Sequence, residues 1–202
     1  TPSIGYIHSM KLFAESIAVV LKFLKIRRVT MIGHSLGGYV ALEFAKKNSE
    51  TIKGLCLLNA SAKKDSNERK KRRTRATKMA QQNLADLVRL SFANLFAEAS
   101  KPLFQKDIKY AINEALKISL QSYMAAQEGM KLRLDSIKFL KESNFKKLYV
   151  IGKSDPIIEA TSLVEEAKNT KASFVEFSGG HMSTIENKKE LIAVLQAFIS
   201  VK

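Results

Sequence analysis

The chain has 202 residues, a length that suits one domain with a substantial core or one domain carrying an insertion. Its hydrophobic fraction of 46% and charged fraction of 26% are ordinary for a globular protein, and no apolar run approaches the roughly 18 residues that span a bilayer. The formal net charge is +15, but 26 lysines far outnumber the 8 arginines and lie along the whole chain, so we expect a solvated basic surface and no nucleic-acid partner.

The first 61 residues predict helices and strands in alternation. Apolar residues recur at helical spacing within 9–26, which predicts an amphipathic helix. RRVTMIG at 27–33 predicts a short buried strand, and residues 36–48 predict a second helix with lysines in its last turn. IKGLCLLNA at 52–60 predicts a second strand, apolar enough to be covered on both faces.

Residues 62–145 carry helix signals and no strand signal. The first helix is the polar stretch SNERKKRRTRATKMAQQ, with Asp65 or Ser66 as its N-cap. Three further helical stretches follow, at 84–97, 107–130 and 134–142.

A strongly basic run occupies the start of this helical region. Nine basic and two acidic residues lie between Lys63 and Lys78. We expect the run to be the solvated face of the first helix. The alternative is a contact for acidic substrate groups or for anionic lipid headgroups.

From residue 146 the alternation of strand and helix resumes. The predicted order is a strand at 146–152, a helix at 157–169, a strand at 172–178 and a helix at 188–201. Such alternation implies parallel strands joined by crossover helices. We therefore predict an α/β core formed by residues 1–61 and 146–202, with residues 62–145 inserted as an all-helical cap.

The segment GHSLG at 33–37 lies where the first predicted strand meets a helix. Ser35 has two interpretations there, a helix cap or a nucleophile. The Gly-x-Ser-x-Gly pattern between strand and helix favours the nucleophile, because the glycines let the turn fold back without a Cβ clash. The backbone N–H of Leu36 points at the same space from the positive end of the helix, so Leu36 is the candidate oxyanion donor.

A serine nucleophile needs a base beside it, and the chain has three histidines. His34 is a poor base, because adjacent side chains on such a turn point apart. His8 has no apparent setting, and we expect it at the surface. His181 follows the last predicted strand in the loop SGGHMS, whose glycines let the imidazole reach over the edge of the sheet. His181 is therefore the candidate base.

Asp155 is the candidate acid that orients this base. It lies in IGKSDPII, just beyond the predicted strand at 146–152. Open parallel sheets place their sites beyond the carboxyl ends of the strands, and Ser35, His181 and Asp155 each follow a separate strand. The competing Asp135 lies among the predicted helices, and Asn59, at the end of the second strand, carries no charge.

These motifs resemble those of the α/β-hydrolase superfamily. GHSLGGYVALEFA resembles the nucleophile elbow of its serine esterases and lipase-like members. IGKSDPI and SGGHMSTIENKKEL resemble its acid and histidine loops. The resemblance implies an α/β-hydrolase fold in which residues 62–145 form the lid. A serine at the elbow argues against epoxide hydrolases and haloalkane dehalogenases, which use aspartate there.

The resemblance also implies strands that the sequence lacks. The family sheet has eight strands and its nucleophile follows the fifth, whereas the residues before 28 predict a single helix. A family loop that supplies a second oxyanion N–H is missing as well. We therefore expect a fragment of a longer chain, or a partner that supplies the first strands.

The sequence thus predicts a serine hydrolase that cleaves a small carboxylic ester or related acyl compound. Two alternatives remain: a catalytically impaired α/β-hydrolase-like fragment or binding module, and a polyanion-binding protein that rests on charge alone. No metal or organic cofactor is implied, because the sequence offers no histidine pair or cysteine cluster. The lone Cys56, expected to be buried, and the lack of a leader lead us to expect a cytoplasmic location.

Overall fold

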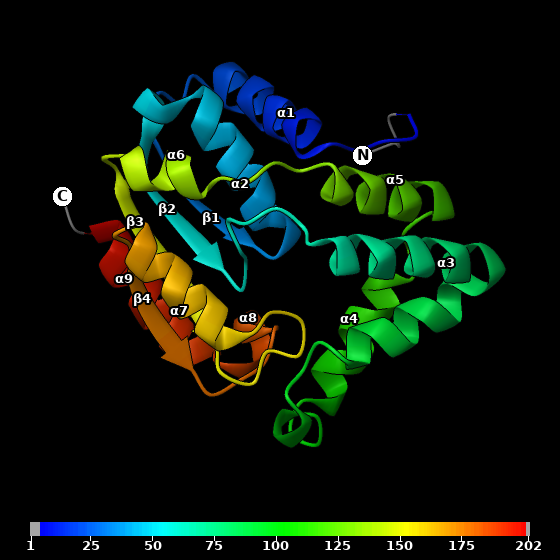
Figure 1. Ribbon diagram of the computed structural model, residues 1–202. Coiled ribbons are helices and arrows are strands. Elements are labelled where there is room, and N and C mark those ends of the chain that lie inside the picture. Colours follow the sequence, from blue (N-terminus) through cyan, green and yellow to red (C-terminus); the bar gives the residue numbers. More distant parts are fainter. Residues whose placement is uncertain (1–4, 201–202) are drawn as a thin grey trace.

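Four parallel strands form the sheet of the computed structural model, which describes residues 5–200 (Figure 1). Their order in the sheet is their order in the chain: β1 (Val29–His34), β2 (Ile52–Leu58), β3 (Lys146–Gly152) and β4 (Ser173–Phe177). Every neighbouring pair is parallel, so each connection must cross back over the sheet. The predicted α/β fold with about four mostly parallel strands is confirmed.

Helices supply these connections. α1 (Met10–Phe23) precedes β1, α2 (Leu36–Lys47) joins β1 to β2, and α7 (Ala160–Asn169) joins β3 to β4. The short α8 (Ser183–Glu186) and α9 (Lys188–Ser200) follow β4. None of the helices within residues 5–200 is long and apolar enough to cross a membrane.

Four more helices lie between β2 and β3, and this described stretch adds no strand to the sheet. They are α3 (Asn67–Ala93), α4 (Gln105–Ala115), α5 (Leu120–Lys131) and α6 (Ile137–Glu142). In Figure 1, α3, α4 and α5 stand together to one side of the sheet, whereas α6 returns to it. Leu140 of α6 is 1% exposed and belongs to the main core cluster. The assignment of residues 62–145 as one cap stays a prediction.

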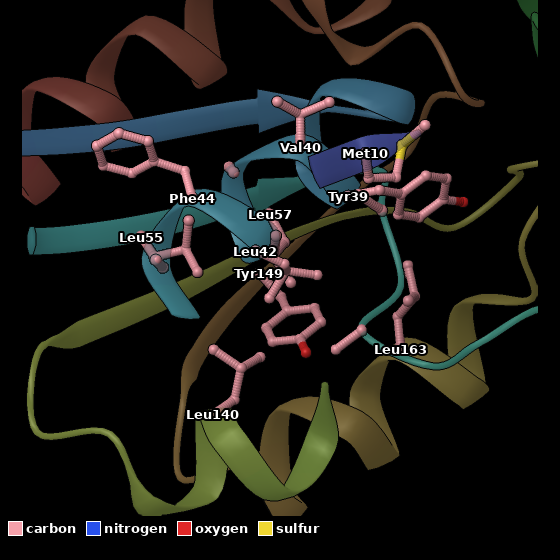
Figure 2. Packing of buried hydrophobic residues seen from close by; sticks show 14 of the residues in the cluster. Met10, Tyr39, Val40, Leu42, Phe44, Leu55, Leu57, Leu140, Tyr149 and Leu163 are labelled. Carbon is pink, nitrogen blue, oxygen red and sulfur yellow. The ribbon is translucent and has the colours of Figure 1, made fainter. Parts of the chain in front are cut away.

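The two faces of the sheet bury different side chains, because successive residues of a strand point to opposite faces. Leu55 and Leu57 of β2 and Tyr149 of β3 face a cluster that α1, α2, α6 and α7 complete (Figure 2). Cys56 and Val150 point to the other face and pack with α9. Cys56 is buried, as expected, and this burial raises the pKa of its thiol to about 12. Cover on both faces explains why β2 and β3 are nearly continuous apolar runs.

Serine side chains fix the starts of two of the inserted helices. Ser66 Oγ accepts the backbone N–H of Arg69 at 3.2 Å, so Ser66 is the N-cap of α3. Ser119 Oγ accepts the N–H of Ser122 at 3.1 Å and starts α5. Because of this second cap, the helical stretch predicted at 107–130 is two helices, α4 and α5.

The segment before α1 runs against α5. The His8 N–H donates to the Ala125 carbonyl at 3.0 Å. A Cβ at Gly129 would lie 1.8 Å from the His8 carbonyl oxygen, so this close approach requires glycine inside α5. His8 is 7% exposed, and the expectation of a surface histidine is wrong because α5 covers it.

β1 is the outermost described strand on its side of the sheet. Within residues 5–200 it pairs with β2 alone, and its Ile32 is 39% exposed. α1 packs on α2 through its buried Met10, and Phe23 at its far end is 83% exposed. The expectation that a further segment supplies additional strands stays a prediction.

Candidate active site

Ser35 lies at the turn between β1 and α2. Its φ of 51° and ψ of −116° put a residue with a side chain into a region that favours glycine. Two backbone hydrogen bonds of 3.0 Å hold the turn, from Ser35 N–H to the Leu58 carbonyl and from Gly38 N–H to the Ser35 carbonyl. The Ser35 side chain makes no cap hydrogen bond to α2, so the helix-cap interpretation does not hold.

A line of two hydrogen bonds joins Ser35, His181 and Asp155. His181 Nε2 lies 2.9 Å from Ser35 Oγ, and His181 Nδ1 lies 2.7 Å from Asp155 Oδ2. The three residues come from three separate loops, after β1, β4 and β3, which meet because the carboxyl ends of parallel strands share one edge. The side chains of His181 and Asp155 are 3% and 0% exposed, so water has little access to the bond between them.

The hydrogen bonds around Asp155 determine its charge. Burial acts to raise the pKa of Asp155, but the hydrogen bond and charge of His181 and the backbone N–H groups of Ile157 and Ile158 hold the pKa below its ordinary value. Asp155 is therefore a carboxylate at neutral pH and only accepts hydrogen bonds. The His181 Nδ1–H donates a hydrogen bond to this carboxylate, which leaves Nε2 as the acceptor that faces Ser35.

A model of the Ndr family matches residues 3–200. The chain belongs to the Ndr family. Its structure is similar to a thermophilic esterase from Thermogutta terrifontis, with a TM-score of 0.91 and 23% identity over 98% of this chain and 74% of that one. An alpha/beta hydrolase enzyme from a Medee basin deep-sea metagenome library gives a TM-score of 0.88 and 19% identity over 99% and 75%. The enol-lactonase from Burkholderia xenovorans gives 0.84 and 19% over 96% and 74%.

These structural similarities confirm the α/β-hydrolase fold, which the sequence motifs imply by their resemblance to that superfamily. At such identities they show a shared fold and not a shared reaction. A comparison with curated proteins gives no significant match to this Ndr-family sequence.

Asn59 is a member of the site that the sequence did not indicate. It follows β2 with a positive φ of 47°, and its Nδ2 donates to Asp155 Oδ2 at 3.2 Å and to the Gly180 carbonyl at 3.1 Å. Asn59 carries no charge, yet its amide ties Asp155 to the loop that holds His181. The signal that could have found it is its position at the end of a strand, at the same edge of the sheet as Ser35, His181 and Asp155.

The glycines of the elbow of this Ndr-family chain have unequal roles. A Cβ at Gly33 would lie 2.4 Å from the Gly37 carbonyl oxygen, and a Cβ at Gly38 would lie 2.4 Å from the Ala60 Cβ. A Cβ at Gly37 would meet nothing within 4 Å. The sequence pattern indicates Gly33 and Gly37, but the close packing of α2 against β1 requires glycine at 33, and its packing against Ala60 requires glycine at 38.

We expect Gly38→Ala to lower the free energy of unfolding by about 1–3 kcal/mol, since the added methyl overlaps Ala60. Gly37→Ala is the matched control, because alanine there enters open space in a helix. Its free energy of unfolding should equal that of the wild type or exceed it by up to about 1 kcal/mol. Urea titration of both variants measures the difference, and equal losses in the two would contradict this packing.

Leu36 is the remaining candidate residue of the site. Leu36 is the first residue of α2, so its N–H is among those at a helix start that have no acceptor within the helix. It adjoins Ser35, and its role as oxyanion donor stays a prediction. Within residues 5–200, no group of three or more histidine, cysteine, aspartate or glutamate side chains is placed to hold a metal ion.

Proposed function

We propose that this chain is a serine hydrolase that cleaves a carboxylic ester, or a related small acyl compound, through an acyl-enzyme. The observation that carries the proposal is the hydrogen-bonded line from Ser35 Oγ through His181 to Asp155, with distances of 2.9 and 2.7 Å. Nucleophile, base and acid are the residue types that acyl transfer requires, in the mutual geometry that it requires.

In the first step, Ser35 Oγ attacks the carbonyl carbon of the substrate while His181 Nε2 takes the hydroxyl proton. The Asp155 carboxylate stabilises the imidazolium that forms. The Leu36 N–H donates to the oxyanion of the tetrahedral intermediate, where the positive end of α2 adds to its effect. His181 then gives the proton to the leaving group, which departs and leaves the acyl group on Ser35.

In the second step, water attacks the acyl carbon while His181 Nε2 takes one of its protons. Collapse of the second tetrahedral intermediate breaks the bond to Ser35 Oγ, which recovers the proton from His181. The acid product leaves, and the residues return to their starting state. Each proton therefore passes through His181 Nε2, the one ring nitrogen that Asp155 leaves free.

A fluorophosphonate probe tests this proposal on the chain as it is. The probe reacts with a serine hydroxyl only where a base activates it, so we expect one label per chain, located on Ser35 by peptide mass spectrometry. Ser35→Ala should take up no label. A folded wild-type chain that stays unlabelled would favour the alternative, a binding module in which Ser35, His181 and Asp155 do not catalyse a reaction.

A further inference from the structure

The backbone of His181 is held at both ends by different parts of the chain. Its N–H donates to the Leu95 carbonyl at 2.8 Å, in the segment that follows α3. Its carbonyl accepts a hydrogen bond of 2.7 Å from His34 Nε2, beside the nucleophile. The two residues before His181 are glycines whose backbone is also bonded: the Gly179 N–H donates to Asn187 Oδ1 at 3.1 Å, and the Gly180 carbonyl accepts from Asn59 Nδ2 at 3.1 Å.

His34 acts here as a hydrogen-bond donor. A carbonyl can only accept, so His34 Nε2 carries the proton that faces His181 O. Burial, more than any other cause, lowers the pKa of His34, and the neighbouring His181 ring lowers it further. His34 is therefore neutral at pH 7 and adds no positive charge beside His181, whose ring centroid lies 5.3 Å away.

Glu186 of α8 supports the N–H side of the His181 backbone, because it binds the segment after α3 to which that N–H donates. Its Oε1 accepts the Ala97 N–H at 2.9 Å, and its Oε2 accepts the Met182 N–H at 3.1 Å. The Glu186 carboxylate thus links two places: the segment at 95–97, whose Leu95 carbonyl accepts from His181, and Met182, the residue after His181. The approach is close, since a Cβ at Gly180 would lie 2.5 Å from the Ala97 nitrogen.

We infer that His34 and Glu186 are positioning residues that fix the peptide of His181 so that its Nε2 stays in reach of Ser35 Oγ. This inference rests on the proposed hydrolase function. Neither side chain contacts Ser35 Oγ through a hydrogen bond; each acts through the backbone on either side of the base. Displacing a catalytic group by about 1 Å costs up to 10²-fold in rate, which sets the size of the expected effect.

Two substitutions at His34 separate positioning from packing. In His34→Gln the amide Nε2 lies at nearly the reach of the imidazole Nε2 and donates to His181 O, whereas in His34→Leu a side chain of similar bulk donates nothing. We expect His34→Leu to lower kcat and the rate of fluorophosphonate labelling by about 10- to 100-fold with KM within threefold of the wild type. His34→Gln should recover most of both rates, and equal losses in the two variants would overturn the inference.

Glu186→Gln is the corresponding test on the N–H side of His181. The glutamine amide nitrogen would place a donor against one of the two backbone N–H groups that the carboxylate accepts. We expect lower kcat, and faster hydrogen exchange in residues 95–97 and 179–182 together, with other segments unchanged. Glu190→Gln is the control, since Glu190 Oε1 accepts from Asn187 and glutamine keeps that acceptor. Faster exchange in only one of the two segments would overturn the tie between them.

The two proposals fail in different ways. If the wild type takes up no fluorophosphonate, the hydrolase function fails, while the exchange experiment still measures the tie that Glu186 makes. If the wild type is labelled on Ser35 but His34→Leu and Glu186→Gln are labelled at the wild-type rate, the hydrolase function stands and the positioning role fails.

Discussion

Replacing Ser35 by alanine should lower kcat for a simple ester by roughly 10⁶-fold, and replacing Asp155 by asparagine should lower it by about 10⁴-fold. In the proposed mechanism, the first change removes the atom that attacks the carbonyl. The second keeps the size of the side chain but removes the charge that sets the tautomer of His181. The graded losses follow from the direction of the hydrogen bonds between Ser35, His181 and Asp155.

The neighbours of Asp155 determine how an asparagine would lie there. Asp155 Oδ1 accepts two backbone N–H groups, from Ile157 at 2.8 Å and Ile158 at 3.0 Å, so the amide oxygen must take that place. The amide nitrogen is then turned toward His181 Nδ1. A donor at that point makes Nδ1 the acceptor, which moves the imidazole proton to Nε2. His181 then donates to Ser35 Oγ and can no longer take its proton.

Steady-state kinetics with an aryl ester, alongside circular dichroism of each variant, measures these losses. Residues that act as one unit give non-additive effects, so Ser35→Ala combined with Asp155→Asn should be no slower than Ser35→Ala alone. Asp155→Asn with activity within tenfold of the wild type would contradict the assigned role of Asp155. Activity that survives Ser35→Ala would come from another nucleophile or from a contaminant.

The parts of the fold that the sequence predicted are those that local pattern determines. The strands at 29–34, 52–58, 146–152 and 173–177 fall within two residues of their predicted bounds, because apolar, β-branched runs between helix signals have few other interpretations. Parallel strands then bring their carboxyl ends to one edge. For that reason the chain positions of Ser35, Asp155 and His181 were enough to predict that they meet.

Other features depend on contacts that local pattern does not contain. Asp65 has the residue type of a helix cap, but Ser66 is the cap, and Asp65 binds arginines that include Arg133, far along the chain. Asn59 acts through its amide and not through a charge, and both of its partners are distant in the sequence. His34 adjoins Ser35 in the sequence, whereas its hydrogen-bond partner is a backbone carbonyl 147 residues away.

Replacing Asp65 by alanine should lower the free energy of unfolding by about 3–5 kcal/mol, the range found when one partner of a buried ion pair is removed. The Asp65 side chain is 0% exposed, and its oxygens accept from Arg133 Nη1 at 2.6 Å and from Arg73 Nε at 2.5 Å. The Arg133 side chain is 4% exposed and lies 3.9 Å over the ring of Tyr39 in α2. Without Asp65, its guanidinium remains buried without that carboxylate.

Arg133 also ties the segment after α5 to the segment before α3, since its Nη2 donates to the Lys63 carbonyl at 3.0 Å. Glu68→Ala is the matched control, because Glu68 pairs with Arg72 at the surface, where the side chains are 73% and 72% exposed. Exposed pairs contribute about 0–1 kcal/mol, so Glu68→Ala should leave urea unfolding nearly unchanged. Similar losses in Asp65→Ala and Glu68→Ala would refute the special role of the buried pair.

The stability that Asp65 contributes should also depend on pH in a defined direction. Burial acts to raise the pKa of Asp65, but its bonds and charge interactions with Arg73 and Arg133 hold the pKa below its ordinary value. A lowered pKa stabilises the folded state above the unfolded value of about 3.9, and that contribution is lost as the pH falls through the lower folded value. The gap in unfolding free energy between the wild type and Asp65→Asn should therefore be constant from pH 7 to pH 5 and narrow below about pH 4. Urea titrations at pH 7, 5 and 3 measure the gap, and a gap that widens in acid would show that Asp65 is not held as a carboxylate by its arginines.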